Sequence, residues 1–324
     1  MNPTYRRRSL LTALLSMALL STPVLAADAP PSWLYPVPPK DYKPELADSA
    51  VVKLPGSKAS YTAGQLRDNF VTGDWYPEEH PTMPDVVKNG RKPSVFACAH
   101  CHRTSGQGGP ENATIAGMPH DYIVRQLKDY RSGARSTAVP GRGPQSGMIQ
   151  AAKNLSDAEI ESAARYFSSL KPAKRVRVQE SATIPKVEAG SWILVKAAGK
   201  ATEPLGRRIV ELPDDLGKFE ARDPRMTFTA YVPPGSVAKG ETLAKTGSGG
   251  KTIPCLACHG PNLKGLGDAP PIAGRSPSSM LRQLHEFKTG VRHGEKADQM
   301  KAVVAKLTLD DMIDLVAYLT TQEP

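Results

Sequence analysis

The sequence predicts a mainly α-helical protein built from two copies of one small unit, with a short β-rich segment between them. Three observations support this fold class. A five-residue cysteine motif occurs twice, at residues 98–102 and 255–259. When the second half is shifted so that these motifs coincide, Ile115 falls on Ile272 and Gly133 on Gly290, which indicates an internal repeat. Helix-start signals occur at equivalent places in both halves, and strand-like runs lie between them.

The N-terminus reads as an export signal. The chain has 324 residues, of which 40% are hydrophobic and 23% charged, a balance typical of folded domains. Arg6 to Arg8 precede an apolar run from Leu10 to Leu20, and Ala26 ends a small-residue cleavage pattern. The apolar run is too short to span a bilayer. We therefore expect cleavage after Ala26 and a periplasmic mature protein.

The positive charge of the chain does not indicate a nucleic-acid-binding protein. The formal net charge is +10, but lysines and arginines are scattered among acidic residues instead of forming one block. A dispersed surplus of positive charge is typical of a surface that docks other proteins, or of one that only keeps the chain soluble. We expect no nucleic acid among the partners.

All four cysteines lie in the two repeated motifs, and both motifs read C-x-x-C-H, the attachment signature of c-type haem. Two thiols at this spacing can each form a thioether to one porphyrin, and the adjacent imidazole then ligates the iron. Disulfides, a zinc site and a redox dithiol are the alternatives; the wide separation of the pairs weighs against zinc, and the lack of a surrounding βαβ pattern weighs against a dithiol. The expected haem-binding residues are Cys98, Cys101, His102, Cys255, Cys258 and His259.

The repeat also indicates the sixth iron ligands. After a short deletion in the second half, Met148 falls on Met300, each at the same interval before the last helix of its unit. A neutral thioether favours ferrous iron and closes the sixth position, which is the chemistry of an electron carrier. Core packing is the alternative for either methionine. Met118 competes for the first haem, but Arg275 stands at its equivalent position. The histidines expected at the surface or in supporting roles are His100, His120, His285 and His293.

Local signals predict the helices of each unit. Ser156 and Thr308 begin capping boxes, so helices are expected over 156–170 and from 308 nearly to the C-terminus. The methionines would lie in loops before these terminal helices. Middle helices are expected over 121–132 and 278–289, each followed by a glycine, and short helices before Gly90 and Gly247.

The segment between the units is too long and too patterned for a linker. Strand-like runs at 175–178, 191–196, 208–212 and 227–232 are separated by Pro and Gly. They predict a small β insert that packs against the helical units or docks a partner. The predicted division is a signal peptide at 1–26, an extended segment at 27–82, the first unit at 83–172, a β-rich insert at 173–234 and the second unit at 235–324.

On these motifs, each unit resembles a class I cytochrome c domain, and the pair resembles periplasmic diheme cytochromes of the cytochrome c-four type. The resemblance covers residues 83–170 and 236–322. It implies two tandem class I domains with two covalently bound haem c groups. The axial pairs that it implies are His102 with Met148 and His259 with Met300.

The same resemblance implies a proline carbonyl that orients each proximal histidine. Pro270 and Pro271 fit this role in the second unit. In the first unit Ala113 and Thr114 occupy the place, where any backbone carbonyl could serve.

The implied function is single-electron transfer between a respiratory or dehydrogenase donor and an acceptor, as a free carrier or as a dehydrogenase subunit. The expected partners are redox proteins: a dehydrogenase, a quinol-oxidising complex or a terminal oxidase, with membrane association only through them. No catalytic residue is assigned, and no enzyme activity is expected. The alternatives are a diheme peroxidase-like enzyme and a haem-based sensor, each of which needs one haem with an open sixth position.

Overall fold

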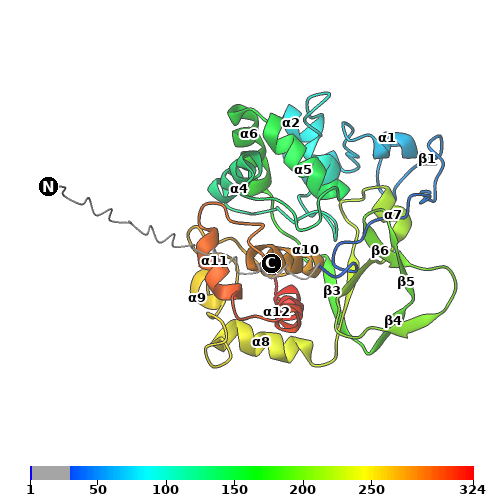
Figure 1. The fold of residues 1–324 in the computed structure, drawn as a ribbon. Helices are drawn as coiled ribbons and strands as arrows, with labels where there is room; N and C mark the ends of the chain where they lie inside the picture. The colour runs from blue at the N-terminus through cyan, green and yellow to red at the C-terminus, as the bar shows by residue number, and fades with distance from the viewer. Residues whose placement is uncertain (2–29) are drawn as a thin grey trace.

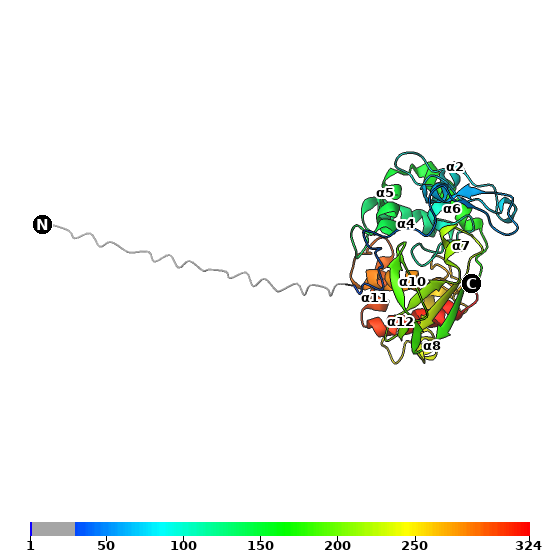
Figure 2. The same ribbon diagram turned by 90° about the vertical axis from the view of Figure 1, so that its right-hand side faces the viewer.

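Two helical units and a group of strands make up the part of the chain that the computed structural model describes, namely Met1 and residues 30–324. The helical units lie one above the other, and the strands lie beside them (Figure 1). In the turned view the strands lie across the second unit (Figure 2). The predicted export signal lies outside the described residues, apart from Met1.

The first unit contains the first cysteine motif and closes with a capped helix. The side chain of Ser156 accepts a hydrogen bond from the Glu159 N–H, and Glu159 caps the chain in return. The middle helix ends at Gly133 with φ of 84°. The predicted terminal and middle helices are confirmed. The helices are α2 (Asp85–Lys88), α3 (Cys98–His102), α4 (His120–Ser132), α5 (Gly143–Asn154) and α6 (Asp157–Ser169).

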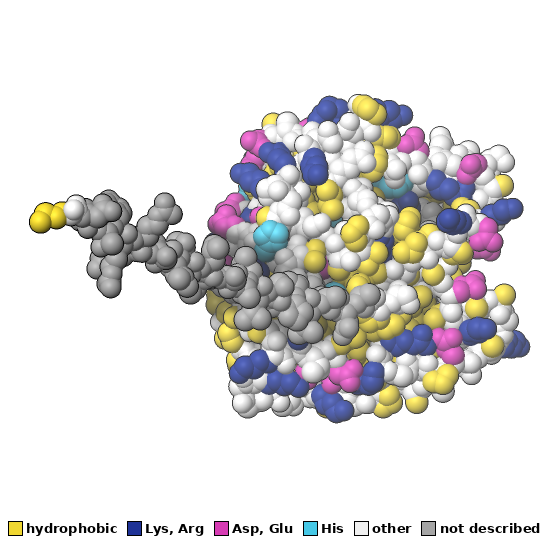
Figure 3. Space-filling view, in the orientation of Figure 1, with side chains coloured by type: hydrophobic (Ala, Val, Ile, Leu, Met, Phe, Trp, Pro, Cys, Tyr) yellow, Lys and Arg dark blue, Asp and Glu magenta, His cyan; other side chains and the backbone are white. Residues whose placement is uncertain are grey.

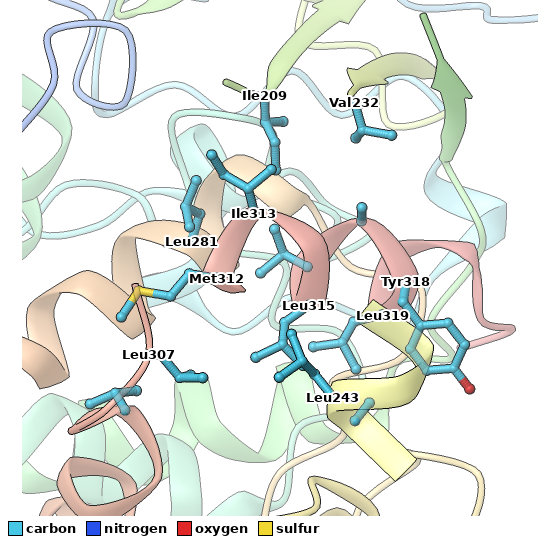
Figure 4. Close-up of a cluster of buried hydrophobic side chains, with 14 of the residues drawn as sticks. Ile209, Val232, Leu243, Leu281, Leu307, Met312, Ile313, Leu315, Tyr318 and Leu319 are labelled. Atoms are coloured by element: carbon cyan, nitrogen blue, oxygen red, sulfur yellow. The ribbon is translucent and has the colours of Figure 1, made fainter. Parts of the chain in front are cut away.

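The second unit repeats this order. Thr308 and Asp311 form the capping box of its terminal helix, as predicted. Leu281, Ile313 and Leu315 belong to its buried core, which Ile209 and Val232 enter from the insert (Figure 4). The helices are α8 (Ser236–Thr246), α9 (Leu256–His259), α10 (Pro277–Lys288), α11 (Ala297–Val304) and α12 (Leu309–Thr321).

The insert between the units is a small β structure. Its main sheet has the order β3-β9-β8, in which β9 runs parallel to β3 and antiparallel to β8. The four predicted runs correspond to β3, β6, β8 and β9. The shorter strands and α7 were not predicted. The elements are β3 (Val176–Glu180), β4 (Thr183–Pro185), β5 (Val187–Gly190), β6 (Ile193–Lys196), β7 (Thr202–Pro204), β8 (Val210–Pro213), α7 (Leu216–Glu220) and β9 (Phe228–Val232).

The segment expected to be extended contains short elements and contacts the insert and the second unit. Its Trp75 indole donates to the Ala221 carbonyl of the insert at 2.8 Å. Leu34 and Tyr35 belong to the core of the second unit. The elements are β1 (Val51–Val52), β2 (Tyr61–Thr62), α1 (Ala63–Arg67) and the 3-10 turn η1 (Pro77–Glu79).

The expectation that Met148 and Met300 lie in loops is wrong. Met148 lies on α5 and Met300 on α11. Helix-favouring Gln, Ala and Lys follow Met148 at 150–153 and flank Met300 at 299–302. In α5, Pro144 sits in the first turn, where its missing N–H costs nothing.

The crossing of α8 and α12 depends on Gly240. A Cβ at this position would lie 1.8 Å from the Asp314 carbonyl oxygen of the facing helix. We expect Gly240→Val to lower the free energy of unfolding by about 2–3 kcal/mol, because the helices would have to separate. Thermal or denaturant unfolding measures the effect. Ala238→Val, on the exposed side of α8, is the control for the β-branched side chain; equal destabilisation by both changes would contradict the close approach.

Candidate haem-binding centres

In the first motif, the helix α3 places the two cysteines and His102 in one turn of chain. The Nδ1 atom of His102 lies 2.9 Å from the Ala113 carbonyl oxygen. A carbonyl can only accept a hydrogen bond, so Nδ1 carries the proton. Nε2 is therefore the atom with a free lone pair, as an iron ligand requires.

The second motif has the same arrangement. The Nδ1 atom of His259 lies 2.7 Å from the Pro270 carbonyl oxygen. Pro270 and Ala113 follow their histidines at the same interval. The backbone supplies the acceptor in both units, so the alanine in the first unit does not disturb the geometry.

The protonation of the two histidines fits imidazole ligation. Burial lowers the pKa of His102 and of His259, so both rings are neutral and can ligate a metal. Burial raises the pKa of the Cys98 thiol to about 12 and of the Cys255 thiol to about 11. None of the four thiols is in a disulfide. In the part of the chain that the structure describes, no group of three His, Cys, Asp or Glu side chains could hold a zinc ion.

Each proposed axial methionine lies in the unit that holds its histidine. Met148 is partly buried against the core of the first unit, and Met300 against the core of the second. Met118 is buried in the same core as Met148, so packing alone does not separate the two candidates. The repeat favours Met148, and the two axial pairs stay predictions.

The remaining histidines in the two units are held by other groups. His100 is buried with Nδ1 3.1 Å from the Val71 carbonyl, and burial lowers its pKa to about 2. The ring of His293 contacts the Gly290 carbonyl. His120 lies beside Asp121 and Glu161, and His285 packs edge-on against Tyr35.

The surroundings of the two motifs differ, and the sequence did not predict this. Arg222 from the insert donates to the His100 carbonyl at 2.9 Å, inside the first motif. Arg103, 2% exposed, lies over the Phe219 ring of α7. It has φ of 65° at the place where the second motif has Gly260. A non-glycine residue at positive φ is strained. The contact of the Arg103 side chain with Phe219 of the insert stabilises this backbone conformation.

The second motif, in contrast, has two residues at the surface, although His259 is buried. Ala257 and Cys258 are exposed. Next to them, Ile253 keeps 45% and Leu266 62% of its surface exposed. These four residues, which we call the open face, include two of the few large exposed hydrophobic side chains among residues 30–324.

Comparisons with known proteins point to one family. The profile of the family described as Cytochrome c matches residues 87–171 and 237–323. This match confirms the predicted fold class of two tandem cytochrome c domains and, with it, two covalently bound haem c groups.

Several curated proteins are similar over most of the chain. A "Thiosulfate dehydrogenase electron acceptor" from Thiomonas intermedia (strain K12) is 28% identical over 72% of this chain and 81% of its own length. A protein of the same description from Stutzerimonas stutzeri (strain A1501) is 27% identical over 71% and 81%. "Cytochrome c4" from Azotobacter vinelandii is 24% identical over 68% and 82%.

Two solved structures are also similar. Thiosulfate dehydrogenase (TsdBA) from Marichromatium purpuratum is 28% identical with a TM-score of 0.48, covering 70% of this chain and 37% of that one. Cytochrome c4 from Pseudomonas stutzeri is 24% identical with a TM-score of 0.44, covering 70% and 93%.

Substitution of the methionines tests the axial pairs. In the haem-loaded protein, we expect Met148→Ala or Met300→Ala to remove about half of the far-red band of Met-ligated ferric haem, because each would open one sixth position. Met118→Ala and Met312→Ala, in the same two cores, are the controls. Loss of the band in Met118→Ala, with Met148→Ala unchanged, would reassign the first ligand.

Proposed function

The chain belongs to the cytochrome c family, and we propose that it accepts single electrons from a periplasmic dehydrogenase and passes them between its two haem domains to a further acceptor. The electron-transfer role itself follows from the family and from relatives described as cytochrome c4 and as electron acceptors. The observation that supports the proposal is the equivalent geometry of the two histidines, each with Nδ1 tied to a carbonyl and Nε2 free.

The residues of the chain hold and tune the two haem groups. Bound haem iron supplies reversible one-electron chemistry. The four cysteines would bind the porphyrins covalently. Neither haem would then dissociate when its iron is oxidised or reduced. Ala113 and Pro270 keep each ring in one tautomer and orientation. Met148 and Met300 would exclude oxygen and peroxide from the irons.

A dehydrogenase is the partner that the relatives favour. Two are described as electron acceptors of thiosulfate dehydrogenase, and the "Cytochrome subunit of sulfide dehydrogenase" from Chlorobaculum tepidum is 30% identical over 29% of this chain. We therefore propose a donor that oxidises an inorganic sulfur compound. This chain would be its electron acceptor, either free or as a subunit.

The location that we propose is the periplasm. The predicted signal peptide supports it, as does the attachment of haem to c-type cytochromes after export. Among the helices of the described residues, none is long and apolar enough to cross a membrane.

We propose that electrons enter through the open face of the second domain. Arg222 and α7 cover the first motif, whereas Cys258, Ile253 and Leu266 are exposed. Lys264 is exposed beside this face. Elsewhere on the surface, basic and acidic side chains are interspersed, as the view in Figure 3 shows. The fitting partner thus presents a small apolar patch.

Charges placed on the open face test this entry site. With purified thiosulfate dehydrogenase and thiosulfate as the probe, we expect Ile253→Asp and Leu266→Asp to lower the second-order rate of haem reduction. The expected decrease is about tenfold, the equivalent of about 1.4 kcal/mol. Val51→Asp, at a residue 66% exposed on β1, is the control.

The possible results separate the two parts of the proposal. An equal decrease in Val51→Asp would contradict entry at the open face. Wild-type protein that this enzyme does not reduce would contradict the sulfur-compound donor. Failure of the wild type to carry two reducible haems per chain would contradict the electron-transfer role.

A further inference from the structure

Arg275 of the second domain reaches into the first domain at the loop behind the first motif. Its Nη1 donates to the Thr114 carbonyl at 2.8 Å and its Nη2 to the Ala116 carbonyl at 3.2 Å. Its Nε donates to the Pro271 carbonyl of its own domain at 2.7 Å. One guanidinium therefore joins the two loops that lie behind the proximal histidines.

The carbonyl groups that bind Arg275 are neighbours of those that orient the histidines. Pro271 follows Pro270, the acceptor for His259. Thr114 follows Ala113, the acceptor for His102. A continuous series of hydrogen bonds and peptide groups thus runs from one proximal imidazole to the other, with Arg275 at its centre.

The burial of Arg275 is costly, which indicates a specific role. The side chain is 4% exposed, and all its hydrogen bonds in the described structure go to backbone carbonyls, with no carboxylate partner. Burial lowers its pKa to about 10, so it is still charged at neutral pH. Desolvating a charge without a counter-ion is unfavourable. The internal repeat does not require an arginine at this position, because the equivalent residue in the first domain is Met118.

The backbone of Arg275 is held firmly in the second domain. The Gly274 N–H donates to the Leu319 carbonyl of α12 at 2.9 Å. The Thr320 hydroxyl donates to the Arg275 carbonyl at 3.0 Å. The side chain therefore projects from a rigid base, and its guanidinium transmits the position of one domain to the loop of the other.

We infer that Arg275 couples the two haem centres, as a positioning residue for both proximal histidines and as the bridge in a hydrogen-bonded route between them. The inference rests on the proposed electron-transfer function. With haem bound in both domains, the electron given up by one group would be taken up by the other, with no bond formed or broken and no proton moved; Arg275 would hold the two histidine loops in place during this transfer. The positive charge of Arg275 would favour the reduced state of a haem bound at either histidine.

Two substitutions in the haem-loaded protein separate the charge of Arg275 from its hydrogen bonds. Arg275→Gln removes the charge and the fork of donors, whereas Arg275→Lys keeps the charge but cannot bridge the three carbonyls. Arg292→Gln is the matched control. Arg292 is 6% exposed and crosses the same domain interface to Tyr122 and Gln126, without contacting either histidine loop.

Three measurements report on the coupling. Laser-flash photoreduction followed in time gives the inter-haem rate, a potentiometric titration gives the two midpoint potentials, and NMR gives the hyperfine-shifted Nδ1–H signals of the axial histidines. In Arg275→Gln we expect a rate about tenfold lower, equivalent to about 1.4 kcal/mol of activation free energy. We also expect lower potentials and shifts of both histidine signals. Arg275→Lys should keep the two midpoint potentials, because the charge remains. It should still lower the inter-haem rate and shift the histidine signals, because the hydrogen bonds are lost.

The outcomes are distinguishable. Equal changes in Arg275→Gln and Arg292→Gln would show a general effect of the interface and overturn the inference. Unchanged histidine signals in Arg275→Gln, with haem content and unfolding as in the wild type, would overturn it as well. Absence of inter-haem transfer in the wild type would instead contradict the proposed function.

Discussion

The hydrogen bond from each proximal histidine to a loop carbonyl is the constraint on which the rest of the structure depends. It selects the tautomer with Nε2 free and fixes the ring between the cysteine motif and the loop. The loop is held in turn by the terminal helix: the N–H groups of Gly117 and Gly274 donate to the Phe167 and Leu319 carbonyls. The capped helices α6 and α12 thereby determine where each imidazole points.

The two domains share this constraint but not their surroundings. The insert covers the first motif through Arg222 and α7, whereas Ala257 and Cys258 of the second motif are exposed. A buried arginine connects the loops behind both histidines. In the proposed function, the second domain would meet partners and the first would be reached through the protein.

Much of the fold and of the site could be predicted because the signals are local. The C-x-x-C-H motifs, the capping boxes at Ser156 and Thr308 and the alternating strand runs each lie within a few residues. A loop was expected around Met148, but the segment forms the helix α5, because several of its residues favour helix. The role of Arg275, the cover over the first motif and the entry of Tyr35 into the second core depend on contacts between distant residues. Sequence periodicity does not contain that information.

We expect both irons to be closed by His and Met ligands and to serve electron transfer only. The most direct test is an optical spectrum of the protein isolated from the periplasm, oxidised and then reduced, with haem counted per chain and carbon monoxide added last. The expected result is two low-spin haems per chain and no reaction with carbon monoxide. A high-spin component, or one haem that binds carbon monoxide, would contradict it and favour a peroxidase-like or sensing role.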